Sequence, residues 1–273
     1  MDIAWVALSL RPHIGLKTLR ALTAHFGDTE SILRADEQAL QAVTGIGPKL
    51  AASIRAVDIE AARTHLRAWE QAGVRLLLPD EFPAPLADLA DAPAVLFVRG
   101  TLPALPLAAV VGTRAPSARA QQVTQRLCRH LVARGMGVIS GLARGVDTTA
   151  HYSTLAADGQ TLAVLGSGAL RIYPAENANL AAQILRRAAL LSEIRPDAPP
   201  NTPALVTRNR LISGLAQAVF VIETDIDGGA MHAARYAQAQ GRPLYVLDQE
   251  SSGNRALLAA GARAFTADLD GLE

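Results

Sequence analysis

Between residues 108 and 247 the sequence alternates short apolar runs with longer stretches of helical periodicity. The apolar runs predict strands at Ala108–Val111, Gly137–Ile139, Thr161–Leu165, Leu190–Ser192, Val219–Glu223 and Leu244–Leu247. The stretches between them predict helices at Ser117–Arg134, Thr148–Ala157, Asn177–Ala188, Ala204–Leu215 and Gly229–Gln240. Strands joined by crossover helices lie parallel in one sheet with helices on both faces. The pattern therefore predicts an α/β fold, in which ligands collect beyond the carboxyl ends of the strands.

The N-terminal part of the chain has a different pattern. Apolar residues recur at helical spacing in Ile14–Phe26 and in Ala39–Ile54. Short apolar runs at Val74–Leu78 and Ala94–Val98 predict two further strands that extend the sheet. We therefore expect a small helical domain over residues 1–68 and an α/β domain over residues 69–273, with the boundary near Arg67–Gly73.

A turn with two glycines, Thr44–Lys49, precedes the start of a predicted helix. It resembles a helix-hairpin-helix turn, whose backbone amides can hold a DNA phosphate, and His13–Lys17 resembles a degraded first copy. The alternative is a plain helical domain without a DNA contact. That alternative stays open because residues 1–109 carry a net charge of −2, which disfavours binding to a polyanion. We expect this domain to add little to the affinity for a nucleic acid.

Positive charge gathers in the middle of the 273-residue chain, although the net charge of the whole sequence is +1. Residues 110–215 carry 12 basic and 5 acidic side chains, a net charge of +7, whereas residues 216–273 have a net charge of −4. The basic segment also contains the ends of most predicted strands. This coincidence indicates a polyanionic ligand at those strand ends.

Three features of the sequence bear on where the protein works. The single cysteine, Cys128, excludes a disulfide framework within one chain. The sequence contains no run of about 18 apolar residues, which is what a membrane-spanning helix would need. Residues 1–15 lack the basic start and the small-residue cleavage site of a secretory signal. We therefore expect a cytoplasmic protein with no membrane contact.

Two successive predicted strands end in loops that combine glycine with arginine. The first loop is Gly112-Thr113-Arg114, and the second runs from Ser140-Gly141 through Arg144 to a helix start near Asp147. Small-residue loops before a helix aim backbone N–H groups at an anion, and the arginine fork can grip a phosphate. The pattern favours one anionic ligand shared by both loops. The alternative, ordinary strand-to-helix turns with solvated arginines, stays open.

Other strand ends carry residues of the same kind. Gly166, Gly168, Tyr173 and Asn177 follow the strand Thr161–Leu165. Gly166-Ser167-Gly168 is a weak match to the glycine-rich motif that binds dinucleotide cofactors, because Arg171 stands where the third glycine of that motif would be. We therefore expect no nucleotide cofactor. Arg208, Asn209 and Arg210 lie in the first turns of the helix predicted over Ala204–Leu215, and we also expect them at this edge of the sheet.

The order of these blocks resembles the DprA/Smf family over about residues 80–262. The blocks are Val111-Gly112-Thr113-Arg114, Ser140–Asp147 with Ala150-His151, Ala163–Gly168 with Tyr173-Pro174 and Asn177, Ser192-Glu193, Arg208–Leu215, Gly253-Asn254 and Gly261-Ala262. The chain departs from the family at Gly228-Gly229-Ala230, where the family has Ser-Gly-Ser. The resemblance implies an extended Rossmann-like, mostly parallel sheet preceded by a small helical domain similar to a sterile-alpha-motif domain.

The resemblance also implies a function. Family members bind single-stranded DNA, load the RecA recombinase onto it during natural transformation, help displace single-strand-binding protein and form homodimers. We therefore expect a DNA-binding protein with no catalytic residue, metal or cofactor. The expected DNA-binding residues are Gly112, Thr113, Arg114, Ser140, Gly141, Arg144, Gly166, Gly168, Tyr173, Asn177, Arg208, Asn209 and Arg210.

The alternative function is that of a nucleotide-processing enzyme of the phosphoribohydrolase-like Rossmann type. Glu223 followed by Gly228-Gly229 resembles its glutamate and phosphate loop, and Glu193 or Asp147 could act as the acid or base. We interpret Asp147 instead as a helix N-cap and Glu193 as a partner of a nearby arginine. A structural hydrogen bond explains His151 better than catalysis does.

Overall fold

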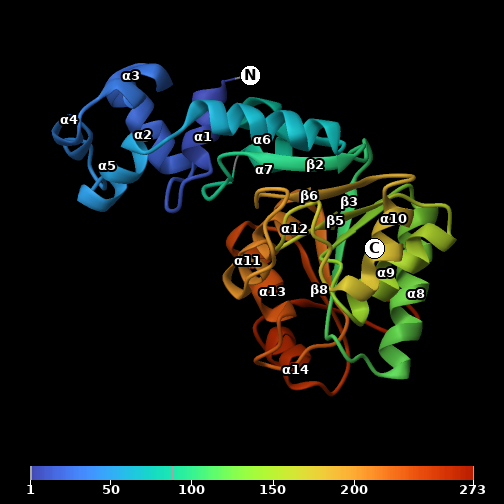
Figure 1. Cartoon of the computed structure of the whole chain (residues 1–273). Coiled ribbons are helices and arrows are strands. Elements are labelled where there is room, and N and C mark those ends of the chain that lie inside the picture. Colours follow the sequence, from blue (N-terminus) through green and yellow to red (C-terminus); the bar gives the residue numbers. More distant parts are fainter. Residues whose placement is uncertain (1, 88, 273) are drawn as a thin grey trace. The chain divides into compact units, whose positions relative to one another are not determined.

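The computed structural model describes residues 2–87 and 89–272 of the chain (Figure 1). It divides into two compact units. The first contains the residues up to Phe82 together with Ala90–Leu96, and the second contains Pro83–Leu89 together with the residues from Phe97 onward. The boundary expected at residues 68 and 69 falls inside a helix, α6 (Ile59–Gln71), and the structure places the division after it.

The first unit is mainly helical. Its elements are α1 (Ile3–Ser9), α2 (Leu16–Phe26), α3 (Thr29–Arg34), α4 (Glu37–Gln41), α5 (Pro48–Arg55), α6, β1 (Val74–Leu77) and η1 (Pro79–Glu81). Aspartate side chains cap the N-termini of α1, α3, α4 and α6, each accepting a backbone N–H of the first turn. Glycines occupy the same position before α2 and α5. Acidic caps and glycine starts thus define where these helices begin.

The second unit alternates strands with helices, as the sequence pattern predicts. The first half contains α7 (Ala84–Ala87), β2 (Leu96–Gly100), β3 (Leu107–Val111), α8 (Ala118–Ala133), β4 (Gly137–Ser140), α9 (Val146–Ala156), β5 (Thr161–Val164), η2 (Ala175–Asn177) and α10 (Ala178–Ile184). The second half contains β6 (Ala189–Ser192), α11 (Thr202–Thr207), α12 (Asn209–Leu215), β7 (Ala218–Val221), α13 (Ala230–Ala239), β8 (Leu244–Leu247), α14 (Ser252–Ala259) and β9 (Arg263–Phe265).

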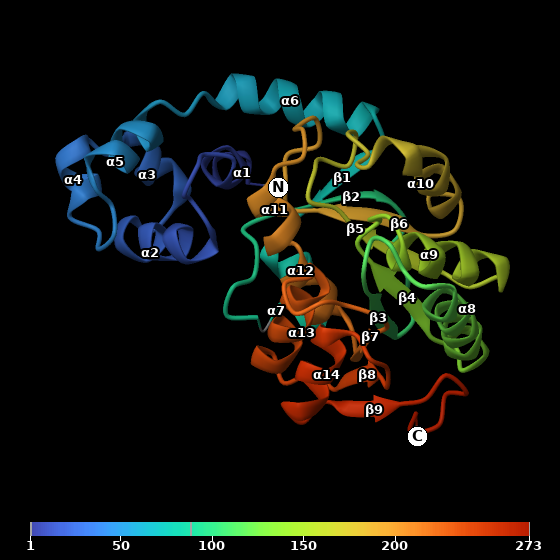
Figure 2. The same cartoon turned by 90° about the horizontal axis from the view of Figure 1, so that it is seen from below.

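The strands of the second unit form one sheet in the order β2-β6-β5-β4-β3-β7-β8-β9. All neighbouring pairs are parallel except β2 and β6, which are antiparallel. Helices α8, α9 and α10 cover one face of the sheet, and α12 and α13 cover the other (Figure 2). The strand order reverses beside β3, where the chain has gone to β4 on one side and later returns to β7 on the other. Such a reversal is where ligands of open α/β sheets bind.

The buried strands explain why this sheet is stable. Every residue of β3, β4, β5, β6 and β8 is buried, as expected for parallel strands covered on both faces. Phe220 stacks on Tyr245 at 5.0 Å between ring centroids, and Phe265 packs edge-on against Phe220 at 6.1 Å. Cys128 is fully buried in the same cluster, and this burial raises the pKa of its thiol to about 12.

The predicted fold class is confirmed, with differences in individual elements. The helix expected over Ala204–Leu215 is divided at Arg208 into α11 and α12. The last apolar stretch of the chain forms α14 and then a short edge strand, β9, which the sequence pattern did not predict. Within the described residues, no helix is both long and apolar enough to cross a membrane.

Candidate nucleic-acid interface

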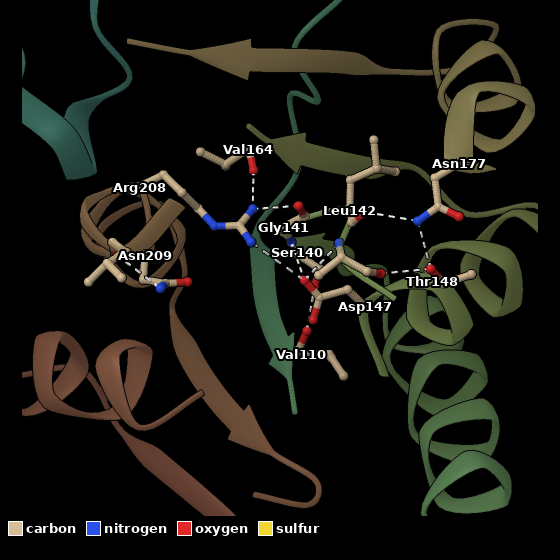
Figure 3. Close-up of polar contacts among 12 residues, drawn as sticks. Val110, Ser140, Gly141, Leu142, Asp147, Thr148, Val164, Asn177, Arg208 and Asn209 are labelled. Carbon is tan, nitrogen blue, oxygen red and sulfur yellow. Dashed lines mark hydrogen bonds and ion pairs between the residues drawn. The ribbon is translucent and has the colours of Figure 1, made fainter. Parts of the chain in front are cut away.

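A buried arginine, Arg208, joins the loop that follows β4 to the last residue of β5. One of its terminal nitrogens donates to the carbonyl oxygens of Gly141 and Val164 (Figure 3). The other lies 3.9 Å from a carboxylate oxygen of Asp147. The Arg208 residue is only 6% exposed, and this burial lowers its pKa while Asp147 opposes the shift. The sequence placed Arg208 correctly at this sheet edge and gave no sign that its side chain points inward.

Asp147 organises the loop that precedes α9. One of its carboxylate oxygens accepts from the backbone N–H groups of Gly141, at 3.1 Å, and Ala143, at 3.3 Å (Figure 3). Burial raises the pKa of Asp147, and the charge of Arg208 is the largest effect opposing this shift. The interpretation of Asp147 as the helix N-cap is wrong, because Gly145 is the N-cap and Asp147 lies inside the first turn. The Asp147 carboxylate accepts hydrogen bonds from backbone amides of the loop before α9 and does not cap the N-terminus of that helix.

Backbone hydrogen bonds join the loop after β3 to the segment after β7 and to the start of α9. The Thr113 N–H donates to the Glu223 carbonyl oxygen at 2.6 Å, and the Thr113 carbonyl accepts from Val146 N–H at 3.1 Å. Gly145 passes so close that a Cβ there would lie 2.3 Å from the Thr113 oxygen, and its φ is +75°. Glycine is therefore required at this position. Gly112, partly buried beside Val146, completes the junction.

A small pocket opens beside these loops. It is lined by Arg114, Gly141, Ala143, Arg144, Tyr173, Pro174, Leu205 and Arg208. Its volume is about 20 Å³, which is roughly the space of one water molecule. A phosphate oxygen fits such a volume. Arg114 is exposed and Tyr173 is 42% exposed, so both are accessible to a ligand that lies over the pocket.

Arg144, expected to meet phosphate, already has a protein partner. Its Nε and one terminal nitrogen donate to the two carboxylate oxygens of Glu176, both at 2.7 Å. The side chains are 60% and 54% exposed. The hydrogen-bonded pairing raises the pKa of Arg144 and lowers that of Glu176. Glu176 was missed by sequence reasoning, although it lies next to Asn177 in a block that the sequence singled out.

Arg210 and Asn209 are buried and lie outside the pocket. Arg210 is buried and forms an ion pair with Glu193, as the interpretation of Glu193 as an arginine partner predicted. The Asn209 side chain is buried too and donates to the Val206 carbonyl at 3.1 Å. Neither residue lines the pocket. The structure therefore brings Arg208 to the pocket and turns Arg210 away from it.

Asn177 and Ser140 do not line the pocket and instead form hydrogen bonds with the backbone around it. Asn177 donates from its side-chain amide to the Leu142 carbonyl and to Thr148 Oγ1, both at 2.9 Å. It thereby supports Leu142, whose φ of 59° is rare for a residue with a side chain. The buried Ser140 hydroxyl donates to the Val110 carbonyl at 2.7 Å.

The two glycines after β5 serve protein packing rather than close approach of a ligand. A Cβ at Gly168 would lie 2.2 Å from the carbonyl oxygens of Arg195 and Pro196. Gly166 packs against the backbone of Leu205 in α11. The glycines thus let the segment before α11 and α11 itself approach β5, which brings Arg208 within reach of Val164.

His151 is a neutral structural residue. Its Nδ1 lies 2.7 Å from Thr161 Oγ1, and the Thr161 hydroxyl donates to the Val138 carbonyl at 2.9 Å. Nδ1 must therefore carry the proton in this contact. Burial, with a smaller effect from Arg208, lowers the pKa of His151 to about 3.

Cationic side chains lie around a small pocket at the carboxyl ends of parallel strands, an arrangement typical of anion sites in the Rossmann-like class of proteins. The chain belongs to the DNA recombination-mediator protein A family, whose model matches residues 74–273. A helix-hairpin-helix motif model matches residues 3–57. The predicted DprA/Smf family is thereby confirmed.

Three known proteins show the extent of the likeness. Protein Smf of Synechocystis is 32% identical over 97% of this chain and 70% of its own length. The X-ray structure of DNA processing protein A from Streptococcus pneumoniae, at 24% identity, shares the fold with a TM-score of 0.84 over 97% of this chain and 94% of that one. The Helicobacter pylori protein is 32% identical, with a TM-score of 0.64 over 70% of this chain and 90% of that one. Its structure was described for a single-stranded DNA binding mode.

Proposed function

We propose that this protein is a recombination mediator that binds single-stranded DNA through the phosphate backbone. The observation that carries the proposal is the pocket at the ends of β3 and β4, where a buried cation, Arg208, lies beside the exposed Arg114. Arg208 Nε has no hydrogen-bond partner among the residues that the structure describes. Asp147 holds the Arg208 guanidinium in place, and the exposed Arg114 adds a positive charge that attracts an anion. The Helicobacter relative binds single-stranded DNA, which supports the proposal.

The pocket is suited to a phosphate oxygen. A cavity of about 20 Å³ admits a group of the size of one water molecule, and cationic side chains line it. Phosphate contacts carry no sequence information. Tyr173 on the rim offers one exposed ring on which any base can stack. We therefore expect weak sequence preference and strong dependence on salt.

A binding experiment tests the proposal directly. Affinities for dT, dA and mixed-sequence oligonucleotides, and for a duplex of the same length, are measured at several salt concentrations. We expect log K to fall linearly with log salt at a similar slope for all single strands, with single strands bound more tightly than the duplex. Salt-independent binding, or a strong preference for one sequence, would overturn the proposed backbone mechanism.

The finer parts of the proposal concern partners. We propose that the single-strand site lies wholly in the second unit, and that the bound strand is handed to RecA recombinase as single-strand-binding protein is displaced during natural transformation, in the cytoplasm. Family membership supports this role. RecA filament assembly on a strand coated with single-strand-binding protein tests it, and we expect the protein to shorten the lag before assembly. An unchanged lag would contradict the role.

The contacts of the acidic residues do not favour a nucleotide-processing enzyme. Glu193 is engaged with Arg210, and Asp147 is buried against Arg208. A carboxylate oxygen of Glu223 accepts from the Ser117 N–H at 2.7 Å, before the first turn of α8. We propose binding without catalysis. Release of free base from nucleoside monophosphates would contradict this part of the proposal.

A further inference from the structure

The Arg144–Glu176 pair lies at the edge of the proposed DNA site. Arg144 belongs to the loop after β4 and lines the pocket, together with Tyr173 and Pro174. Glu176 follows Pro174 by two residues, within η2. More than half of each side chain is exposed, so an incoming anion has access to the guanidinium.

Glu176 and a DNA phosphate compete for the same donors. The two parallel hydrogen bonds from Arg144 to Glu176, both 2.7 Å long, use the guanidinium edge that also binds a phosphate bidentately. Exposed ion pairs are weak, because water and salt screen them. The pair is therefore strong enough to hold Arg144 in the free protein and weak enough for a strand to break.

We infer that Glu176 is an internal counterion of Arg144, which a strand phosphate displaces, and that it thereby limits both the affinity and the salt dependence of single-strand binding. The inference rests on the proposed function. Glu176 is thus an affinity-setting residue of the site.

The loop does not need the Glu176 carboxylate for its own structure. Asn177 already holds this region through Leu142 and Thr148, and Asp147 holds the amides of Gly141 and Ala143. The hydrogen bonds of the Glu176 carboxylate go to the Arg144 guanidinium. The pair can therefore open while the loop keeps its shape.

Displacement of an internal counterion has a signature in salt titrations. A phosphate that binds an arginine releases a condensed cation, which contributes about 0.7 to the salt slope for a single strand. When the phosphate displaces Glu176, the freed carboxylate keeps a negative charge beside the strand and offsets part of the Arg144 charge, so fewer cations are released at Arg144. Removal of the carboxylate charge should restore the missing contribution.

The test is Glu176→Gln, which keeps the side-chain shape and removes the charge. We expect the variant to bind an oligo-dT strand about two- to fivefold more tightly at low salt, since an exposed pair is worth up to about 1 kcal/mol. The salt slope should become steeper by up to about 0.7. Equal or weaker binding by the variant would overturn the inference, because it would mean that Glu176 supports Arg144 instead of competing for it.

Two controls separate displacement from general charge repulsion. Asp158→Asn removes one negative charge from an exposed pair with Arg187, beyond the far end of α9, and should leave binding unchanged. In an Arg144→Ala background, Glu176→Gln should give no gain, since the competed donors are gone. An equal gain in that background would overturn the inference. If Arg114→Ala weakens binding while Glu176→Gln has no effect, only the inference fails; if neither the parent nor its variants bind single strands, the proposed function fails.

Discussion

The Arg208 guanidinium and the Asp147 carboxylate form a buried ion pair 3.9 Å apart beneath the loop that follows β4. Each of the two side chains is 7% exposed. Around this pair, Arg208 donates to backbone carbonyls after β4 and in β5, while Asp147 accepts from backbone amides of the loop. The pair thus converts two neighbouring strand ends into one rigid site. Its burial makes the structure sensitive to the loss of either partner.

Arg208→Met should therefore destabilise the fold. The substitution leaves the Asp147 carboxylate buried without its cation and removes donors from two carbonyl oxygens. Breaking one partner of a buried pair costs about 3–5 kcal/mol. Urea denaturation at neutral pH measures the loss, and Arg134→Ala, at an exposed position after α8, is the control with an expected change below about 0.5 kcal/mol. A loss for Arg208→Met no larger than that of the control would contradict the role of the pair.

The stability of the protein should fall in mild acid because of His151. The unfolded pKa is near 6.5 and the folded pKa is about 3, so the unfolded chain binds more protons between these values. Stability contributed by the neutral imidazole is complete above pH 6.5 and declines as the pH falls toward 3, by up to about 5 kcal/mol over the full window. Urea denaturation at pH 7, 5.5 and 4 measures the decline.

His151→Asn is the matched variant for that measurement. Its amide keeps a donor near Thr161, but it does not titrate. We expect a lower stability at pH 7 and a shallower decline toward acid than in the parent. Identical pH slopes for the two proteins would show that another group governs the acid response.

Arg114→Ala should weaken single-strand binding to a similar degree for all sequences. Arg114 is exposed and lines the pocket, so its loss leaves no buried charge without a partner. Loss of one phosphate contact should lower the salt slope by about 0.7. Fluorescence anisotropy across a salt series measures both effects. Arg134→Ala removes an equal charge at the far end of α8 and should bind like the parent. If Arg114→Ala also binds like the parent, the pocket is not the single-strand site.

The helical first unit should contribute little to single-strand affinity. Residues 1–109 carry a net charge of −2, so their field does not favour a polyanion. Lys17→Ala and Lys49→Ala, at the starts of α2 and α5, should each change single-strand affinity by less than about twofold. Losses as large as that of Arg114→Ala would place part of the single-strand site in this unit.

We also expect a homodimer, which would set two basic sites on one particle. The sheet of the second unit ends at β9, a strand of three residues, and Ile226 is 52% exposed. Self-association through a two-fold interface would cover such an edge in both copies. Sedimentation at micromolar concentration measures it. A monomer would contradict the dimer. Equal affinity per site for long and short strands would contradict the gain in affinity that we expect when one strand binds two linked sites.

Much of the fold follows from local patterns in the sequence. Apolar runs and helical periodicity predicted β3 to β8 and the helices between them, because parallel strands buried on both faces must be continuously apolar. The glycine and arginine residues after these strands predicted a common edge, and Arg114, Arg144 and Arg208 do line one pocket there. Parallel strands bring their carboxyl ends together whatever the detailed packing.

The direction and the partner of each side chain depended on the tertiary structure. Arg208 and Arg210 are two positions apart in the sequence, and a helix turns by about 200° over two residues, so they face opposite sides. Arg208 meets the carbonyls of two strand ends, while Arg210 meets Glu193. Arg144 finds Glu176 across 32 residues of chain. Sequence alone determined which residues reach the sheet edge; packing between distant segments decided which of them are buried, paired or open to a ligand, because burial and partners arise only when the segments meet.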